Sequence, residues 1–294
     1  MRTGNIAAFT AIVLSSTPGC IGRNIPYEGG SLDTAVEVVA CGDESGFDVG
    51  YRIEGTTRDL ATGSPLTFDE AAGEQGLCVF AVDPTKALAG QDPDIVASSY
   101  VCADGRYVLQ GITAKPALGL FVAIDDGGKL GCDYSGDATV MLTATGLGPE
   151  LYEDLSDGGA ILDIEALSLS SEHAAALQAD LGGYGYVPED GSLEADGFMG
   201  GFILDSAEAP VGGATITCSS CDATYYWDQD PADGIFGAGA TANTSTDSAA
   251  EGMFLIPGAG ITNYTTADDG SHTWEPKLYG SVPEYAVFIR LVAQ

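Results

Sequence analysis

Short apolar runs recur along the whole chain, and Gly, Pro, Asn, Asp or Ser residues separate them. Most runs are rich in Val, Ile, Tyr and Thr and place alternate residues on one face, as a half-buried β-strand does. Strands are predicted over residues 35–40, 50–53, 77–82, 95–101, 107–112, 118–124, 140–145, 201–204, 214–218, 253–256 and 285–292. Many short strands with turn signals between them indicate antiparallel β-sandwiches, so the predicted fold class is all-β.

One segment between the two halves follows a helical pattern instead. Its apolar positions fall on one face at helical spacing, namely Ala174, Leu177 and Leu181. Ser170 or Ser171 can cap its N-terminus, and Gly182-Gly183 supplies a stop. The pattern predicts a short helix over residues 171–181, which we expect to be a packed connector between two domains.

A weak internal repeat favours two related domains. The first half contains Pro65 and then Asp104-Gly105-Arg106-Tyr107-Val108-Leu109, and the second contains Pro210 and then Glu251-Gly252-Met253-Phe254-Leu255-Ile256. In each acid-Gly turn, the glycine can take a positive φ and start a strand whose alternate residues face a core. Each half therefore has a strand, a Pro turn, further strands, an acid-Gly turn and another strand.

The second half resembles the carboxypeptidase regulatory-like family, a transthyretin-like β-sandwich that occurs as repeated modules in bacterial envelope proteins. The residues that carry the resemblance are Pro210-Val211-Gly212-Gly213-Ala214-Thr215-Ile216, Thr246-Asp247 and Glu251-Gly252-Met253-Phe254-Leu255-Ile256-Pro257. The first half resembles it more weakly, through Asp59, Thr62-Gly63, Pro65 and Asp104-Gly105-Arg106-Tyr107. The resemblance implies two tandem antiparallel sandwiches, immunoglobulin-like or transthyretin-like, that have no catalytic activity.

The N-terminus has the layout of a secretory signal. Met1-Arg2 is followed by an apolar run over residues 6–14 and then by small residues up to Cys20. Gly19-Cys20 resembles the end of a bacterial lipobox, which implies that Cys20 carries a lipid. Thr17 and Pro18 depart from that pattern, so ordinary cleavage to a periplasmic or secreted protein is the alternative. Export and anchoring at the outer membrane or cell surface are predicted.

These features divide the chain into a signal peptide (1–19), a lipidated N-terminus and tether (20–34), sandwich domain 1 (35–145), a connector with the helix (146–193) and sandwich domain 2 (194–294). The formal charge is −33, with 10 Lys and Arg against 43 Asp and Glu. Binding to nucleic acid is excluded, because it depends on basic residues that meet phosphate. High net charge also favours a soluble monomer.

The chain has 7 cysteines, and those other than Cys20 form an even set, as disulfide pairing in an exported protein requires. The four cysteines of the first half allow three connectivities. We favour Cys78 with Cys102, because each lies in a strand-like run, and Cys41 with Cys132. Cys218 and Cys221 have the spacing of a redox or zinc motif, but the expected setting of neither is visible, so a loop disulfide is preferred.

No catalytic constellation is recognised in the sequence. The 2 histidines are His173 and His272, and nucleophile-elbow, P-loop and dinucleotide-binding patterns are absent. His272 and Glu275 match the HxxE spacing of metallocarboxypeptidases, but the chain ends too soon to supply the third ligand of that family. Neither enzymatic activity nor a cofactor is expected.

Two weaker binding signals occur in the second half. Asp228, Asp230 and Asp233 resemble a calcium loop but are out of register with the EF-hand spacing, so no metal is predicted. Tyr225, Trp227 and Trp274 are candidate ligand-binding residues, because flat rings beside carboxylates suit sugars. Packing of these rings in the core is the favoured interpretation.

Two functions therefore stand as hypotheses. The first is a non-catalytic, membrane-anchored envelope lipoprotein with a structural, adhesion or protein-interaction role. The alternative is a carbohydrate-binding module of an envelope polysaccharide-handling system. The expected partners are the membrane, through the lipid, and envelope proteins or glycans.

Overall fold

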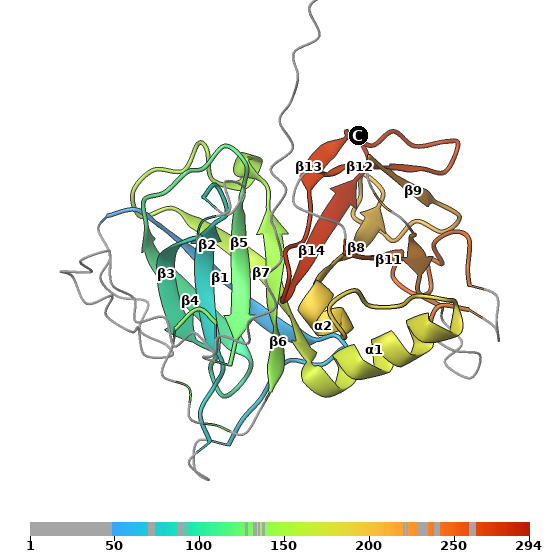
Figure 1. The fold of residues 1–294 in the computed structure, drawn as a ribbon. Helices are drawn as coiled ribbons and strands as arrows, with labels where there is room; N and C mark the ends of the chain where they lie inside the picture. Colours follow the sequence, from blue (N-terminus) through green and yellow to red (C-terminus); the bar gives the residue numbers. More distant parts are fainter. Residues whose placement is uncertain are drawn as a thin grey trace, which may run out of the picture. The chain divides into compact units, whose positions relative to one another are not determined.

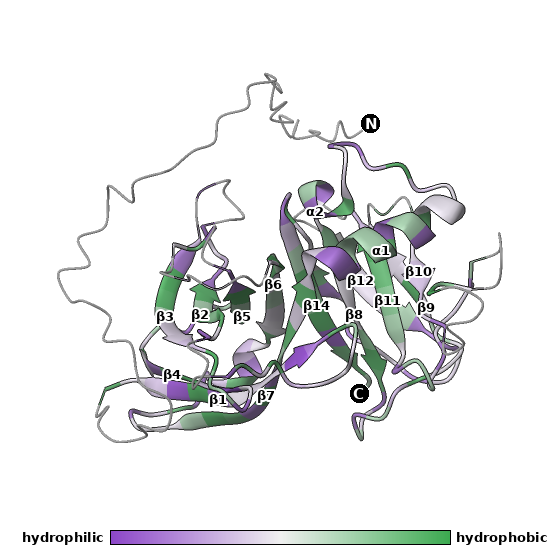
Figure 2. Cartoon of the chain, turned by 90° about the horizontal axis from the view of Figure 1, so that it is seen from below, coloured by the Kyte–Doolittle hydropathy of each residue, from purple (hydrophilic) through white to green (hydrophobic). Residues whose placement is uncertain are grey.

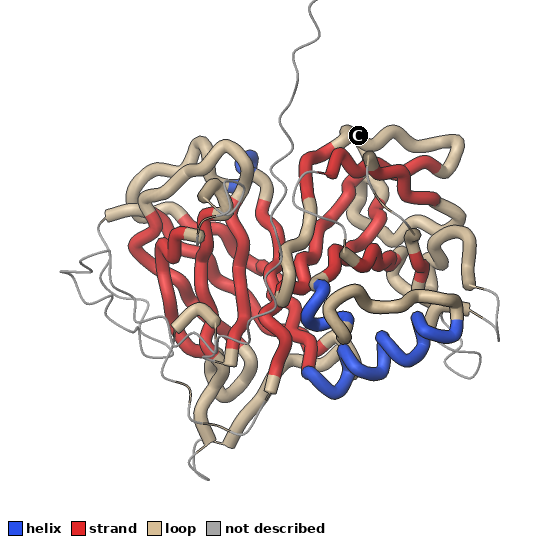
Figure 3. Tube along the Cα trace, viewed as in Figure 1, coloured by secondary structure: helices blue, strands red, loops and turns tan. Residues whose placement is uncertain are grey.

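The computed structural model describes residues 49–69, 74–86, 91, 93–126, 129–131, 134, 136, 139–219, 221, 223–228, 235–237, 242–258 and 263–294. The regular secondary structure in this part of the chain is mostly β-strand, with few helices (Figures 1 and 3). The predicted signal peptide, the tether and the strand at 35–40 lie outside it.

The strands of the first half precede the main helix. They are β1 (Tyr51–Asp59), β2 (Cys78–Asp83), β3 (Asp94–Tyr100), β4 (Arg106–Ile112), β5 (Leu120–Asp125), β6 (Val140–Leu147) and β7 (Ala160–Ser170), with a 3₁₀ turn at Pro149–Leu151 before β7. Each predicted run in this range contributes to one strand. The strand β7 was not predicted.

The predicted helix is observed as α1 (Ser171–Gly183). The Ser170 hydroxyl caps it by accepting a hydrogen bond from the His173 backbone N–H at 3.1 Å. Ala174, Leu177 and Leu181 are its buried residues. A short helix, α2 (Leu193–Asp196), leads into the second half.

The strands of the second half are β8 (Phe198–Leu204), β9 (Thr215–Cys218), β10 (Tyr225–Tyr226), β11 (Met253–Pro257), β12 (Asn263–Asp268), β13 (Lys277–Tyr279) and β14 (Tyr285–Val292). In the described residues, the strands form an 11-stranded mixed sheet and a 3-stranded sheet. The large sheet contains the path β10-β11-β8-β14-β6-β5-β2-β3, with β1, β4 and β7 branching from it, and the small sheet has the order β13-β12-β9.

The structure does not show the predicted tandem antiparallel sandwiches, because one large mixed sheet contains strands of both halves. The last strand, β14, pairs in parallel with β8 of its own half and with β6 of the first half. The sheet therefore continues from one half into the other, with β6, β14 and β8 as neighbours (Figure 2). Parallel pairing needs long connections, and local turn signals cannot reveal it.

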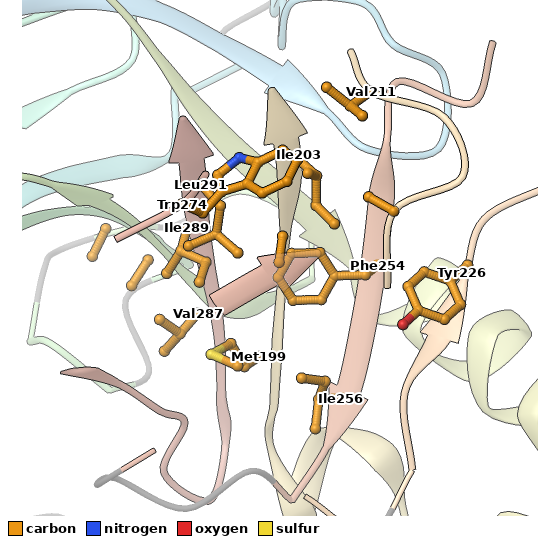
Figure 4. Close-up of a cluster of buried hydrophobic side chains, with 14 of the residues drawn as sticks. Met199, Ile203, Val211, Tyr226, Phe254, Ile256, Trp274, Val287, Ile289 and Leu291 are labelled. Carbon is orange, nitrogen blue, oxygen red and sulfur yellow. The ribbon is translucent and has the colours of Figure 1, made fainter. Parts of the chain in front are cut away.

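The cores are also shared between the halves. One cluster joins Phe80 and Leu142 of the first half to Phe254 and Ile289 of the second. Figure 4 shows its second-half members, among them Trp274, which comes from the loop between β12 and β13. A second cluster packs α1 against residues of both halves, and a third lies within the first half.

The internal repeat corresponds to equivalent strand pairings. In the first half, β1 pairs antiparallel with β4 and in parallel with the last strand, β7. In the second half, β8 pairs antiparallel with β11 and in parallel with the last strand, β14. Gly105 precedes β4 with φ +84°, and Gly252 precedes β11 with φ +65°. The Gly105 carbonyl accepts from Thr57 N–H at 2.8 Å, and the Gly252 carbonyl accepts from Ile203 N–H at 3.0 Å. The two acid-Gly turns thus hold the same position in the two halves.

Candidate functional site

A cavity of about 570 Å³ lies where the two halves share the sheet. Residues of β1, β6, β7, β8, β13 and β14 line it, together with the turns that flank these strands. Of its apolar lining residues, Leu147, Leu167, Phe288 and Ile289 are buried, and Phe202 is partly exposed. The volume is within the range of about 300–1,000 Å³ that is typical of ligand sites.

Charged side chains around this cavity form ion pairs. Arg58, on β1, contacts Glu251 at 2.6 Å and Glu165 at 3.4 Å. The hydrogen bond to Glu251 raises the pKa of the Arg58 guanidinium, although burial acts against this shift. Arg290 contacts Glu208 at 2.8 Å. Every base that lines the cavity is therefore matched with an acid, since Lys277 also lies 3.7 Å from Glu150.

Some of these pairs connect the two halves. Arg58 with Glu251 and Lys277 with Glu150 join residues from opposite halves, as does Lys129 with Glu284 at 3.3 Å outside the cavity. Partly exposed pairs of this kind contribute only about 0–1 kcal/mol each. Their contribution to the stability of the fold is therefore small.

Asp163 differs from the other acids of the cavity. Its carboxylate forms no ion pair or hydrogen bond with any residue that the structure describes, and its φ is +59°. Glu208 and Glu251 also have positive φ, at +62° and +59°. Non-glycine residues in this region cost free energy and tend to gather at functional sites. Sequence reasoning missed this cavity altogether.

The candidate aromatic residues do not come together in one surface. Tyr225 is buried and its ring lies 5.8 Å from that of Phe236, while Trp227 is partly buried at 4.8 Å from the same ring. Trp274 is buried in a different cluster, where its Nε1 donates to the Leu204 carbonyl at 3.1 Å. A sugar could reach Trp227 alone of the three.

The other predicted sites are only partly within the described residues. Cys218 and Cys221 are joined by a disulfide, with their Cα atoms 5.8 Å apart. Cys78 and Cys102 are both disulfide-bonded. Cys20, Cys41 and Cys132 lie outside the described residues, so lipidation and the pairing in the first half stay predictions.

The weak calcium candidates gain nothing from the structure. Asp230 and Asp233 lie outside the described residues, and the Asp228 carboxylate accepts a hydrogen bond from the Asn243 side-chain amide at 3.1 Å. Among the residues that the structure describes, no group of three or more His, Cys, Asp or Glu side chains could hold a metal ion.

An Asp-Ser-His cluster occurs in the turn after β12. The Asp269 carboxylate lies 2.6 Å from His272 Nδ1, and the Ser271 hydroxyl lies 3.4 Å from the same nitrogen. A catalytic triad instead places serine and aspartate on opposite ring nitrogens. Hydrogen bonds from the His272 backbone and side chain hold the pKa of Asp269 far below its usual range. The cluster is an exposed turn stabilised by its own side chains.

No helix in the described part of the chain combines the length and apolar character that crossing a membrane requires. No protein-family model and no curated protein matches the sequence, so the resemblance to the carboxypeptidase regulatory-like family gains no support.

Several solved structures match part of the fold at low scores. The Bacillus anthracis TIE protein has a TM-score of 0.24 at 10% identity, and the match covers 84% of this chain but only 34% of that protein. The shaft pilin SpaA from Lactobacillus rhamnosus GG has a TM-score of 0.23 at 10% identity, with 83% and 96% covered. A streptococcal ancillary pilin has a TM-score of 0.22 at 11% identity, with 83% and 62% covered. At these TM-scores we draw no argument from the likeness.

Proposed function

We propose that this protein is a non-catalytic protein of the bacterial cell envelope, anchored through a lipid on Cys20, with an adhesion or protein-interaction role. We further propose that its two halves are related β-sandwiches that have fused through β6 and β14. The proposal includes a monomeric chain, because its charge of −33 disfavours self-association.

One observation supports the non-catalytic role: every Lys and Arg side chain that lines the cavity forms an ion pair with an acid of the same cavity. Arg58 contacts two carboxylates. A catalytic site instead positions a nucleophile, a base and an oxyanion stabiliser around the place of a reacting atom. Side chains that connect neighbouring strands suit a scaffold that presents a surface to a partner.

Metabolic labelling with an alkyne-tagged fatty acid tests the anchor. We expect the wild-type chain to incorporate the label and to fractionate with membranes. Cys20→Ala should abolish both, whereas Ser15→Ala, a change within the same predicted signal region, should leave both intact. A wild-type chain that is unlabelled and found only in the soluble fraction would contradict lipid anchoring.

A further inference from the structure

We propose that the cavity binds a cationic side chain, lysine or arginine, from an extended segment of a partner protein. This inference deepens the proposed function, because it names the kind of partner that the envelope protein would contact. It depends on three properties of the cavity: its charge, its apolar lining and the unpaired Asp163.

The charge of the cavity favours a cation. Five acids line it, Glu150, Asp163, Glu165, Glu208 and Glu251, against the three bases Arg58, Lys277 and Arg290. The excess of two negative charges lies in a chain that is itself strongly acidic. A field of this sign attracts basic partners and raises their rate of association.

Asp163 is the carboxylate that remains available to such a partner. The other four acids already contact Arg58, Lys277 or Arg290. Asp163 is exposed, lines the cavity and forms no ion pair with any described residue. An incoming ammonium or guanidinium group can therefore pair with Asp163 without displacing an existing partner.

The apolar residues of the cavity complement the rest of such a side chain. Lysine and arginine carry long hydrocarbon stems that pack on apolar surface while the charged head stays with polar groups. Phe202 and Leu151 both line the cavity and are accessible, and Leu151 is 42% exposed. Acidic glycans and polyanions do not match this site, because like charges at an interface are repulsive.

A binding experiment on the full chain in non-ionic detergent tests the inference. The probe is a peptide of alternating leucine and lysine that carries a neutral dye, and the readout is fluorescence polarisation. The peptide with every lysine replaced by glutamine is the first control. We expect saturable binding of the lysine peptide and no binding of the glutamine peptide.

Two protein variants locate the contact. Asp163→Asn removes one charge from the cavity, and Asn tolerates positive φ well, so the backbone is kept. Glu189→Gln removes one charge from an exposed position outside the cavity. We expect Asp163→Asn to weaken binding about three- to fivefold, as for a partly exposed ion pair, and Glu189→Gln to leave binding unchanged.

Equal weakening by the two variants would mean that the peptide responds only to the overall charge, and would overturn the site. Failure of the lysine peptide to bind, or saturable binding of a neutral oligosaccharide at this cavity instead, would overturn the proposed ligand class. These outcomes leave the fatty-acid labelling result untouched. The inference and the proposed anchor therefore fail separately.

Discussion

Gly252 provides a direct test of the turn that recurs in the two halves. Its φ is +65°, and a Cβ added there would lie 2.6 Å from the Ile203 carbonyl oxygen and within 3.3 Å of the Val211 carbonyl oxygen. The Ile203 oxygen belongs to the backbone of β8, a central strand of the sheet, and cannot simply rotate away. Gly252→Ala should therefore force the turn apart from β8.

The cost of Gly252→Ala has two parts. Placing a residue other than glycine in the left-handed region costs about 1–2 kcal/mol. Overpacking against rigid neighbours typically costs about 1–3 kcal/mol more. Gly213→Ala separates the two, because Gly213 has φ +79° but nothing lies within 4 Å of its added Cβ. We expect a loss of about 2–5 kcal/mol for Gly252→Ala, and of about 1–2 kcal/mol for Gly213→Ala.

Equilibrium unfolding in urea, followed by tryptophan fluorescence, measures both losses. Gly105→Ala is the matching change in the first half, where the added Cβ would lie 2.7 Å from Pro65 Cβ and 2.8 Å from the Leu66 carbonyl oxygen. It should cost as much as Gly252→Ala. If Gly252→Ala and Gly105→Ala lose no more stability than Gly213→Ala, the close approach of neighbouring atoms to these two glycines has no energetic effect and the reasoning is refuted.

Two further changes test the charged groups. Arg58→Gln should lower the free energy of unfolding by about 1 kcal/mol at low salt and by less at high salt, because two ion pairs are lost. The control Arg106→Gln breaks an exposed ion pair with Asp104 and should cost less. Equal losses of stability for the two variants in urea unfolding would contradict the role of Arg58. Burial lowers the pKa of His173, against an opposing effect of Asp59, so the unfolded chain binds the proton more readily. The free energy of unfolding should therefore fall as the pH drops below about 6.5, the pKa of histidine in the unfolded chain. His173→Gln should reduce this pH dependence. Identical profiles of stability against pH for the wild-type chain and the variant would refute the role of His173.

Local signals predicted most of the strands, but β7 shows where they stop. Its burial pattern breaks in the middle, because the register against β1 shifts between Ile161 and Ile164, at the positive φ of Asp163. The alternation of apolar and polar residues consequently changes phase inside the strand. A period-two search cannot follow such a change, so a strand was missed where only a helix was expected.

The pairing of β14 with β6 was beyond sequence reasoning for a different reason. The pattern of residues 285–292 predicts a strand, but no residue within it specifies a neighbouring strand more than a hundred positions away in the sequence. The same limit applies to the cavity, whose charged residues extend from Arg58 to Arg290 along the chain without any spacing pattern. In contrast, Gly105 and Gly252 could be found, because the turn that each one starts is a local feature.

Site-specific photocrosslinking in intact cells tests most directly whether this protein contacts a partner through the cavity. A photoreactive amino acid at Leu151, which is 42% exposed and lines the cavity, should crosslink to an envelope protein. The same amino acid at Val187, which is 78% exposed and lies outside the cavity lining, should not. We predict a Leu151 adduct that maps to a lysine- or arginine-containing segment and that Asp163→Asn diminishes. Equal crosslinking from both positions, or none from Leu151, would contradict the account.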